Sequence, residues 1–389
     1  MLPEFENTEI AFRYRSNAEL KQARFLFASM GSPVLTSVGM AFTKFAMALH
    51  LPINGLIKRT IFKQFCGGES IHEAAETAVM LGDFNIGVIL DYGVEGKEGE
   101  SEFDAAVPEF LKAIDFAASQ KNIPFISIKV TGFSRFALLE KLHSGESLSA
   151  DEKQEWRRVE QRIDAICARA AQQNIKVLVD AEESWIQNPI DELTDRMMES
   201  YNKKEAIVYN TFQLYLHSRL PFLQVSYTRA IEKGYLLGAK LVRGAYMEKE
   251  RNRAIEKNYP SPVQTDKKAT DNDYDEAVDF CINRLDKLAL FIGTHNEKSC
   301  LLAAKKMHEK NISFTHPHIY FSQLFGMSDN ISFNLASQGF HVAKYLPYGP
   351  VRDVMPYLMR RAQENTSVAG QTGRELGLIN KELKRRKLL

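Results

Sequence analysis

The segment NIGVILDYG, residues 85–93, is the first of eight short β-rich segments along the chain. Stretches of helical character separate these segments, for example EWRRVEQRIDAICARAAQQ at 155–173. Near-continuous apolar strands that alternate with helices indicate a parallel sheet covered by helices. Eight strand–helix units in roughly 270 residues fit an α/β fold, a (βα)8 barrel of the TIM type. The other seven segments are FISIKVTG (125–132), KVLVDAE (176–182), AIVYNTFQ (206–213), AKLVRGAY (239–246), LFIGTHN (290–296), HIYFSQLFG (318–326) and HVAKYLPYG (341–349).

The rest of the chain is predicted to be helical. Ser16 is a candidate N-cap with Glu19 as its capping-box partner, and the stretch 71–82 reads as an amphipathic helix that ends at Gly82. Between residues 33 and 67 we expect two apolar helices, broken near Pro52 and Gly55. We therefore expect an N-terminal helical segment (1–80), a barrel (81–370) and a C-terminal tail (371–389). An open doubly wound sheet is the alternative, but the chain contains neither GxGxxG nor GxxxxGK[ST].

The composition excludes several classes of protein. Fifty Lys and Arg against 49 Asp and Glu give a net charge of +1, so no basic excess points to nucleic acid. The four cysteines are far apart and none belongs to a CxxC pair, which disfavours zinc and redox sites and favours buried thiols in a reducing compartment. The HPH motif at 316–318 lacks further ligands at metal-binding spacing, so we expect no metal site.

No stretch is long and apolar enough to predict a membrane span. The most apolar region, residues 31–65, is interrupted by Lys44, His50 and Lys58, and the N-terminus lacks the features of a signal or transit peptide. We therefore expect a cytoplasmic protein, with peripheral contact at the inner face of the membrane as an alternative. The basic end KELKRRKLL reads as a frayed, solvated tail or as a weak contact with an anionic membrane.

Polar side chains stand at or beyond the end of every predicted strand. In a TIM barrel the catalytic residues lie where strands meet the loops that follow them. A single buried charge is usually a paired core ion, but a polar group at every strand end favours a mixed-charge cavity at the mouth of the barrel. These residues include Asp91, Lys129, Thr131, Asp180, Glu182, Gln213, Lys240, Arg243, Thr294, His295, Gln323 and Lys344.

Five motifs in order along the chain resemble the proline dehydrogenase family: VDAEES, KLVRGAY, GTHN, QLFGM and KYLPYGP…PYLMRRAQEN. The resemblance covers about residues 80–370 and is nearest to the monofunctional, eukaryotic-type branch. It implies a distorted (βα)8 barrel that binds FAD across its C-terminal mouth. It also implies oxidation of L-proline to Δ1-pyrroline-5-carboxylate, the first step of proline catabolism. Hydride passes to flavin N5 and electrons pass on to a membrane quinone.

The resemblance also implies roles for individual residues. Arg360 and Arg361 match the pair that holds the substrate carboxylate, and guanidinium forks suit this task because they bind carboxylates bidentately. Lys129, Asp180, Tyr345, Arg360 and Arg361 are the predicted catalytic residues. The predicted substrate-binding residues are Glu95, Lys129, Asp180, Tyr246, Leu324, Tyr345, Tyr357, Arg360, Arg361 and Glu364. The predicted cofactor-binding residues are Gln213, Lys240, Gly244, Ala245, Thr294, His295, Asn296 and Gln323, with Ser322 as an alternative to Gln323.

The helix spacing of YLMRRAQEN agrees with a clamp, that is, with two arginines that hold the substrate carboxylate as the resemblance implies. Tyr357, Arg360, Arg361 and Glu364 stand at i, i+3, i+4 and i+7, which is one helical face. The segment follows the eighth predicted strand, so its start is expected at the mouth of the barrel. We interpret this face as Tyr357 against the proline ring, two arginines on the carboxylate, and Glu364 holding the arginines in position.

Three other functions remain as alternatives. Relatives that use hydroxyproline carry serine where Tyr345 stands, so tyrosine favours proline, and hydroxyproline dehydrogenase is the runner-up. A Schiff-base aldolase acting through Lys129 would need no flavin. A barrel retained as a ligand-binding scaffold would bind flavin without being reduced by proline.

Overall fold

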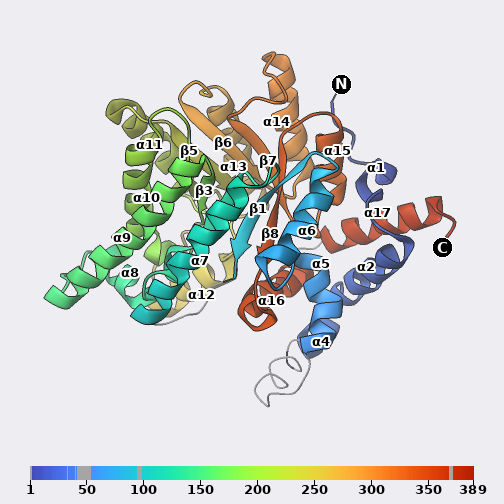
Figure 1. Cartoon of the computed structure of the whole chain (residues 1–389), viewed down its shortest axis with the longest axis horizontal. Helices are drawn as coiled ribbons and strands as arrows, with labels where there is room; N and C mark the ends of the chain where they lie inside the picture. The colour runs from blue at the N-terminus through green and yellow to red at the C-terminus, as the bar shows by residue number, and fades with distance from the viewer. Residues whose placement is uncertain (1, 33, 40, 42–53, 94–98, 368–370) are drawn as a thin grey trace. The chain divides into compact units, whose positions relative to one another are not determined.

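The computed structural model describes residues 2–32, 34–39, 41, 54–93, 99–367 and 371–389. Its described part divides into two compact units: the terminal unit, residues 3–95 and 323–389, and the middle unit, residues 96–322. The eight strands of the described residues form a closed barrel in chain order, with helices between successive strands (Figure 1). The predicted α/β barrel of the TIM type is confirmed.

All recorded strand pairs are parallel, and each strand lies within one of the predicted segments or overlaps it. In the terminal unit the last strand pairs with the first, Ile86 opposite Val342 and Tyr92 opposite Tyr348. The second strand is shorter than predicted because Gly132 N–H donates to the Lys129 carbonyl and closes a 3-10 turn. The strands are β1 (Ile86–Tyr92), β2 (Phe125–Ile128), β3 (Lys176–Val179), β4 (Val208–Gln213), β5 (Leu237–Val242), β6 (Leu288–Gly293), β7 (Ile319–Leu324) and β8 (Val342–Tyr348).

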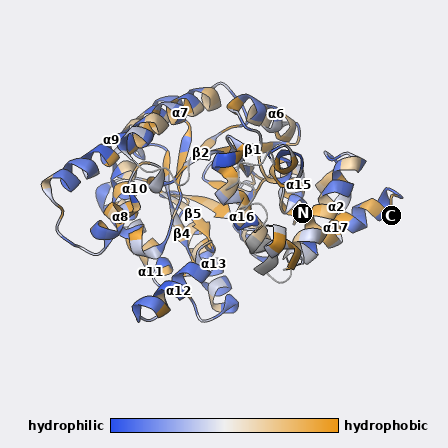
Figure 2. Cartoon of the chain, turned by 90° about the horizontal axis from the view of Figure 1, so that it is seen from below, coloured by the Kyte–Doolittle hydropathy of each residue, from blue (hydrophilic) through white to orange (hydrophobic). Residues whose placement is uncertain are grey.

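The helices of the middle unit bury one face each. In α9 the buried residues Val159, Ile163, Ile166 and Ala170 recur at helical spacing, and Figure 2 shows hydrophilic and hydrophobic residues alternating along this helix. The elements are α7 (Glu100–Ala118), η2 (Val130–Gly132), α8 (Phe136–His143), α9 (Ala150–Gln173), η3 (Ser184–Ile186), α10 (Gln187–Tyr201), α11 (Arg219–Lys233), α12 (Met247–Lys257), α13 (Lys267–Ile282) and α14 (Glu297–Glu309).

The helices of the terminal unit come from both ends of the chain. The predicted capping box of Ser16 and Glu19 is present, and the predicted helix 71–82 is observed with the same bounds. The predicted break near Pro52 lies outside the described residues, and Gly55, the other predicted break position, is helical. The elements are α1 (Thr8–Phe12), α2 (Asn17–Met30), α4 (Asn54–Ile57), the π-helical η1 (Lys58–Phe62), α5 (Lys63–Phe65), α6 (Ile71–Gly82), α15 (Asp329–Ser337), α16 (Val351–Ser367) and α17 (Gln371–Arg385).

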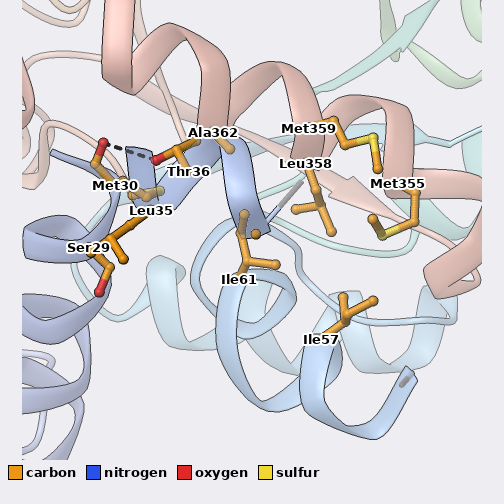
Figure 3. A pocket seen from close by; sticks show the side chains of 11 residues that line it. Ser29, Met30, Leu35, Thr36, Ile57, Ile61, Met355, Leu358, Met359 and Ala362 are labelled. Atoms are coloured by element: carbon orange, nitrogen blue, oxygen red, sulfur yellow. Dashed lines mark hydrogen bonds between the residues drawn. The ribbon is translucent and has the colours of Figure 1, made fainter. Parts of the chain in front are cut away.

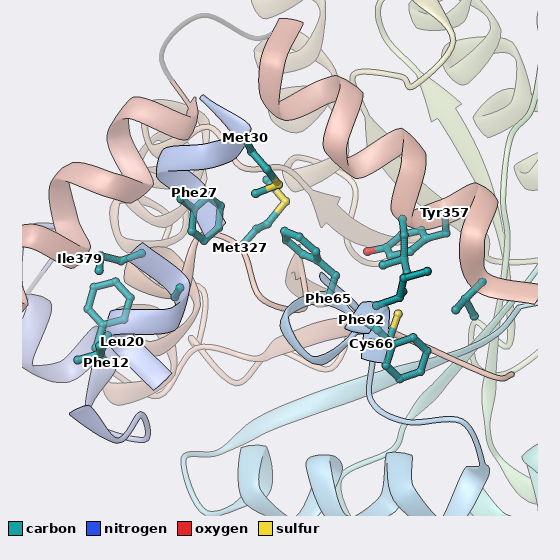
Figure 4. Packing of buried hydrophobic residues seen from close by; sticks show 14 of the residues in the cluster. Phe12, Leu20, Phe27, Met30, Phe62, Phe65, Cys66, Met327, Tyr357 and Ile379 are labelled. Carbon is teal, nitrogen blue, oxygen red and sulfur yellow. The ribbon is translucent and has the colours of Figure 1, made fainter. Parts of the chain in front are cut away.

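The C-terminal residues form helix α17, and the expected frayed tail is wrong. Leu378, Ile379 and Leu383 are buried in one apolar cluster with residues of α1, α2 and α5, and Figure 4 shows part of this packing. Arg386 donates to the backbone carbonyls of Phe12 and Arg15, each at 2.8 Å. The C-terminal helix is therefore fixed to the N-terminal helices by apolar burial and by hydrogen bonds.

The four cysteines, Cys66, Cys167, Cys281 and Cys300, are free and buried, as predicted. Burial raises the pKa of each thiol, which disfavours the reactive thiolate. Among the helices that the structure describes, none has the length and apolar character that crossing a bilayer requires.

Candidate active site

Two lysines and one aspartate meet at the ends of strands in the middle unit. Lys129 follows β2, Asp180 follows β3, and Lys240 lies in β5. The Lys129 Nζ is 3.4 Å from Asp180 Oδ2, and the Lys240 Nζ donates to Asp180 Oδ1 at 2.5 Å. All three side chains are largely buried, with exposed fractions of 17%, 14% and 9%. The structure therefore brings together two predicted substrate-binding residues and one predicted cofactor-binding residue.

Two ammonium groups act on one carboxylate in this cluster. Lys129 also interacts electrostatically with the buried Glu182. Taking a charge out of water costs free energy that only an opposite charge or hydrogen bonds can offset. The cluster therefore offers two ammonium groups that can donate to an anionic group and one carboxylate that can accept from a cationic or N–H group.

The side chain and the backbone carbonyl of Glu182 connect the ends of β2, β3 and β4. Glu182 accepts from the Thr131 backbone N–H at 3.1 Å and from the Thr131 hydroxyl at 2.5 Å, and its own carbonyl accepts from Gln213 Nε2 at 2.7 Å. Burial raises the pKa of Glu182 to about 7, although the hydrogen bonds from Thr131 oppose this rise. Predicted cofactor residue Gln213 is thus held in place by the strand end that carries Asp180.

The turn after β5 leaves backbone groups exposed. Gly244 has φ +134°, and a Cβ at this position would stand 1.8 Å from the ring of Tyr215, so only glycine fits. Gly244 and Ala245 are both exposed, and the half-buried Tyr246 precedes α12 as its N-cap residue. The predicted cofactor residues Gly244 and Ala245 therefore present backbone groups that a ligand can reach.

The end of β6 is shaped by an arginine that the sequence prediction did not assign to the site. Arg243 donates to the Thr294 hydroxyl at 2.8 Å and pairs with Asp271 at 2.7 Å. Asn296 caps α14, because its side-chain oxygen accepts from Lys298 N–H at 2.9 Å. The sequence showed Arg243 in KLVRGAY as a strand-end cation, but not its partners, Asp271 on α13 and Thr294 after β6.

In the terminal unit, helix α16 carries part of the predicted clamp. The guanidinium carbon of Arg361 lies 5.2 Å from the centre of the Tyr357 ring, which is a cation–π distance, and both residues are buried. Arg360 is half-buried on the same helix. Glu364 lies inside α16, where only the backbone is described, and Glu95 lies outside the described residues.

Successive residues of β7 and β8 point to opposite sides of the sheet. The Ser332 hydroxyl of α15 donates to Gln323 Oε1 at 2.7 Å, so Gln323 faces the helix that follows its strand. Lys344 also faces α15, where it lies 2.9 Å from Asp329 Oδ1. By alternation, Ser322 and the buried Tyr345 face the other side, toward the barrel interior. This geometry favours Ser322 over Gln323 as the ligand-facing residue, and Leu324 is half-buried at the end of β7.

The buried charge of Lys344 serves the fold. Asp329 lies between Lys344 and Arg15, 3.2 Å from the latter, and also accepts from the Tyr14 hydroxyl at 2.7 Å. Burial alone would raise the pKa of Asp329, but the two cations hold it below its usual range. A strand-end lysine in the sequence is here a paired core ion that ties the N-terminal helices to β8.

The chain matches known proteins over most of its length. A family model described as proline dehydrogenase matches residues 74–374. Proline dehydrogenase 1, mitochondrial, of Dictyostelium discoideum is 34% identical over 87% of this chain and 67% of its own length. The carbapenem antibiotics biosynthesis protein CarD of Pectobacterium carotovorum is 35% identical over 83% of each chain. A hydroxyproline dehydrogenase of Xenopus laevis is 32% identical over 85% of this chain and 78% of its own length.

A solved structure shares the fold. Proline utilization A from Bdellovibrio bacteriovorus superposes with a TM-score of 0.73 over 95% of this chain, at 19% sequence identity. The chain spans 40% of that longer protein. At this identity the likeness supports the barrel architecture, and activity has to be argued from the site.

Proposed function

Because the chain belongs to the proline dehydrogenase family, we propose that it oxidises L-proline to Δ1-pyrroline-5-carboxylate. In this reaction the ring carbon next to nitrogen loses a hydride and the nitrogen loses a proton, so that a C=N bond forms. The substrate is a small zwitterion, with a carboxylate and an ammonium group on neighbouring atoms. A protein site for it needs cations for the carboxylate and an acceptor for the N–H groups.

The observation that carries the proposal is the cluster of Lys129, Asp180 and Lys240. Asp180 supplies an acceptor for the N–H groups of a substrate that loses a proton from nitrogen. Lys129 and Lys240 supply cations that can stabilise the negative charge that builds on the electron acceptor. We propose that Arg360 and Arg361 bind the carboxylate, with Glu364 and Glu95 as partners of these arginines. Tyr246, Leu324, Tyr345 and Tyr357 are proposed to position the ring.

We propose FAD as the cofactor, and the residues of the middle unit fit it. Lys240 lies in β5, and the exposed backbone at Gly244 and Ala245 follows this strand. Residues 294–296 follow β6, which is adjacent to β5 in the sheet, and Gln213 ends the neighbouring β4. When bound, FAD supplies the two-electron acceptor that protein side chains lack. The residues proposed to hold it are Gln213, Lys240, Gly244, Ala245, Thr294, His295, Asn296 and Ser322, in place of Gln323.

Proline is preferred over hydroxyproline in this proposal because of Tyr345. Tyr345 is buried in the middle of β8, where a serine would leave room for a 4-hydroxyl group. A difference of one small group in a pocket is worth about 1–3 kcal/mol, so some oxidation of hydroxyproline is expected.

The salt bridge of Lys129 disfavours the aldolase alternative. A Schiff-base lysine has to be a neutral amine, and neighbouring apolar or cationic groups usually lower its pKa for this purpose. Asp180 instead stabilises the ammonium form of Lys129.

A lipid-soluble quinone is proposed as the final electron acceptor, which the family resemblance implies. The predicted cytoplasmic location stays a prediction, and several relatives carry the word mitochondrial in their names.

The decisive experiment is a visible spectrum of the purified protein before and after anaerobic addition of L-proline. We expect a flavin absorption band that bleaches with proline. A colourless protein that still binds proline would support the aldolase, and a yellow protein that proline fails to bleach would support the scaffold. Either result would overturn the proposed function.

A further inference from the structure

Glu250 is a buried carboxyl group that the proposed reaction does not use. It lies near the start of α12, and its exposed fraction is 0%. Among the described residues its hydrogen-bond donors are neutral: the Ser184 backbone N–H at 2.7 Å, the Ser184 hydroxyl at 2.6 Å and the Tyr215 hydroxyl at 3.5 Å. Burial raises the pKa of Glu250, although the hydrogen bonds from Ser184 oppose this rise. Burying a carboxyl group costs free energy that neutral donors offset only in part, so its place calls for a reason other than stability.

Glu250 connects the segments that follow three neighbouring strands. Ser184 begins η3, four residues after Asp180, which follows β3. Tyr215 lies two residues after Gln213, which ends β4, and α12 itself follows β5. Strands β3, β4 and β5 are adjacent in the sheet. One buried carboxyl group therefore joins the polypeptide beyond the ends of all three strands.

The turn that is proposed to bind FAD lies between two of these attachments. Gly244 belongs to the turn that joins β5 to α12. On the β5 side, the Tyr215 N–H donates to the Arg243 carbonyl at 2.8 Å, and the Tyr215 ring fills the space beside Gly244. On the α12 side, the Glu250 N–H donates to the Tyr246 carbonyl at 2.9 Å. The conformation of the turn therefore depends on Tyr215 on one side and on Glu250 on the other.

Other contacts between α12 and the segment after β3 are more open to water. Lys249 pairs with Glu183 at 2.7 Å, but the Lys249 side chain is 63% exposed, and exposed ion pairs contribute little. The Arg253 guanidinium carbon lies 4.5 Å from the centre of the half-buried Trp185 ring. Glu250 has no exposed surface, so its hydrogen bonds are the contacts in this group that water screens least.

We propose that Glu250 is a positioning residue for FAD: it holds α12 against the segment after β3 and so fixes the exposed backbone at Gly244 and Ala245. The inference rests on the proposed function, because it takes FAD as the ligand of this turn. Since Glu250 has no exposed surface, it acts through the turn and does not touch the ligand. A turn that is fixed before binding raises affinity, because less conformational entropy is lost when the ligand binds.

Two substitutions separate the hydrogen bonds of Glu250 from its charge. In Glu250→Gln the amide oxygen can accept from the Ser184 N–H, and the amide NH2 group can donate to the Ser184 hydroxyl. Glu250→Leu removes both bonds. We expect the Kd for FAD to rise about tenfold or more in Glu250→Leu and to stay within about twofold of the wild-type value in Glu250→Gln.

The Kd is measured by diluting the purified holoprotein and following flavin fluorescence, which rises when FAD is released. The matched control is Glu256→Leu, which removes an exposed carboxyl group from the same helix and should leave the Kd unchanged. Ile57→Ala controls for a general loss of stability. It removes buried carbon atoms from the wall of a largely apolar cavity of about 200 Å³ in the terminal unit (Figure 3). It should lower the thermal midpoint and leave the Kd unchanged.

Trp185 reports on the position of α12 independently of FAD. The chain has two tryptophans, so Trp156→Phe leaves Trp185 as the single fluorophore of this kind. Because the Trp185 ring contacts Arg253 of α12, its emission should shift to longer wavelength when α12 moves away. We expect this shift in Glu250→Leu and not in Glu250→Gln, both in the Trp156→Phe background.

Ser184→Ala is the milder test and remains decisive where circular dichroism shows that Glu250→Leu is unfolded. It removes one of the two hydrogen bonds and should raise the Kd about threefold. Added to a folded Glu250→Leu variant, it should have no further effect, because both substitutions break the same contact.

Several results would overturn the proposal. They are a wild-type Kd in folded Glu250→Leu, equal weakening by Glu250→Gln and Glu250→Leu, and fully additive effects of Ser184→Ala and Glu250→Leu. A wild-type Kd in Ser184→Ala would overturn it where Glu250→Leu is unfolded. A wild-type protein that binds no FAD would contradict the proposed cofactor itself, and this inference with it.

Discussion

The burial of Arg361 beside Tyr357 is the residue-scale feature with the most direct functional consequence. Arg361→Met keeps the length and apolar body of the side chain but removes the guanidinium. We expect the KM for proline to rise by roughly thirtyfold to a few thousandfold, because losing one member of a buried charge pair costs on the order of 2–5 kcal/mol. Steady-state kinetics together with the flavin-to-protein ratio measure this effect.

The control for this prediction lies on the same helix. Arg352 is exposed on α16, so Arg352→Met should leave KM unchanged. A near-normal KM in Arg361→Met with full flavin content would remove Arg361 from the proposed substrate site.

Tyr345→Ser, in the middle of β8, tests substrate choice. We expect the ratio of kcat/KM for hydroxyproline to that for proline to rise about tenfold or more, because the smaller side chain makes room for a hydroxyl group. Tyr345→Phe keeps the ring and should leave the ratio as it is. If Tyr345→Ser and Tyr345→Phe give the same ratio, Tyr345 does not face the substrate.

The buried carboxyl group of Glu182 predicts a pH dependence of stability. Its pKa in the folded protein, about 7, lies above the ordinary value of 4.5, so the folded state binds this proton more tightly than the unfolded state. The stabilisation is full below pH 4.5 and is lost as the pH rises toward 7, by up to about 3 kcal/mol. Glu182→Gln should flatten this part of the profile of thermal midpoint against pH.

An exposed glutamate provides the comparison for Glu182. Glu256→Gln removes a solvated carboxyl group from α12 and should leave the profile unchanged. A profile for Glu182→Gln that falls as steeply as that of the wild type between pH 5 and 7.5 would contradict the assignment.

The sequence predicted which polar residues lie together at strand ends, but not which side of its strand each residue faces. Lys129, Asp180 and Lys240 were identified from strand-end polarity and motif resemblance, and the structure brings them together. Gln323, near the end of β7, and Lys344, within β8, were counted with the same strand-end groups, but both face α15 and bind residues of that helix. The side of a strand that a residue faces depends on register, which a shift of one residue inverts.

At the scale of elements, β4 and β5 approach each other so closely that one position excludes a side chain. A Cβ on Gly238 would lie 2.2 Å from the Val208 carbonyl oxygen and 2.9 Å from Tyr209 Cα. Because both contacts are with backbone, Gly238→Ala forces the strands apart. We expect a loss of roughly 3 kcal/mol or more in the free energy of unfolding, measured by chemical denaturation.

Gly377 in α17 is the opposite case. A Cβ there would meet no atom within 4 Å, and the residue is helical and exposed. Gly377→Ala should raise stability by roughly 0.5–1 kcal/mol, because alanine loses less backbone entropy in a helix. Equal effects of the two substitutions would show that the contacts of Gly238 do not decide its identity.

The helices and strands were predicted well where the spacing of their apolar residues is regular. All eight strands coincide with apolar segments, because a barrel strand is buried on both faces and carries a continuous signal. Helix α17 was missed because its buried face includes Thr372, Glu375 and Glu382 beside its leucines. These polar residues interrupt the apolar period, and their burial depends on partners such as Ser328 for Glu375 and Arg386 for Glu382, which the apolar pattern does not reveal.

At the scale of the whole molecule, α17 joins the two ends of the chain. Removing residues 371–389 exposes the apolar residues of α1 and α2 that now pack on it and leaves Ser328 without its bond to Glu375. We expect the thermal midpoint to fall by roughly 10 °C or more. Differential scanning calorimetry measures this change.

Single substitutions distinguish the effect of lost packing on stability from the effect of a shorter chain. Leu383→Asp places a charge in the buried cluster and should reproduce much of the loss, whereas Leu389→Asp changes a residue that is 53% exposed and should have little effect. A truncated protein with the midpoint of the full-length chain would mean that α17 adds no stability.

The pairing of β1 with β8 has a consequence for how the protein is made. A ribosome finishes β1 early, yet its partner in the terminal unit emerges only after the entire middle unit has been synthesised. The middle unit is contiguous in sequence and can begin to fold before the C-terminal residues of the terminal unit are synthesised. The terminal unit has to wait, and closing so long a loop slows its formation. During that interval the apolar N-terminal helices lack the C-terminal residues that cover them, so the nascent chain is expected to depend on chaperones until translation ends.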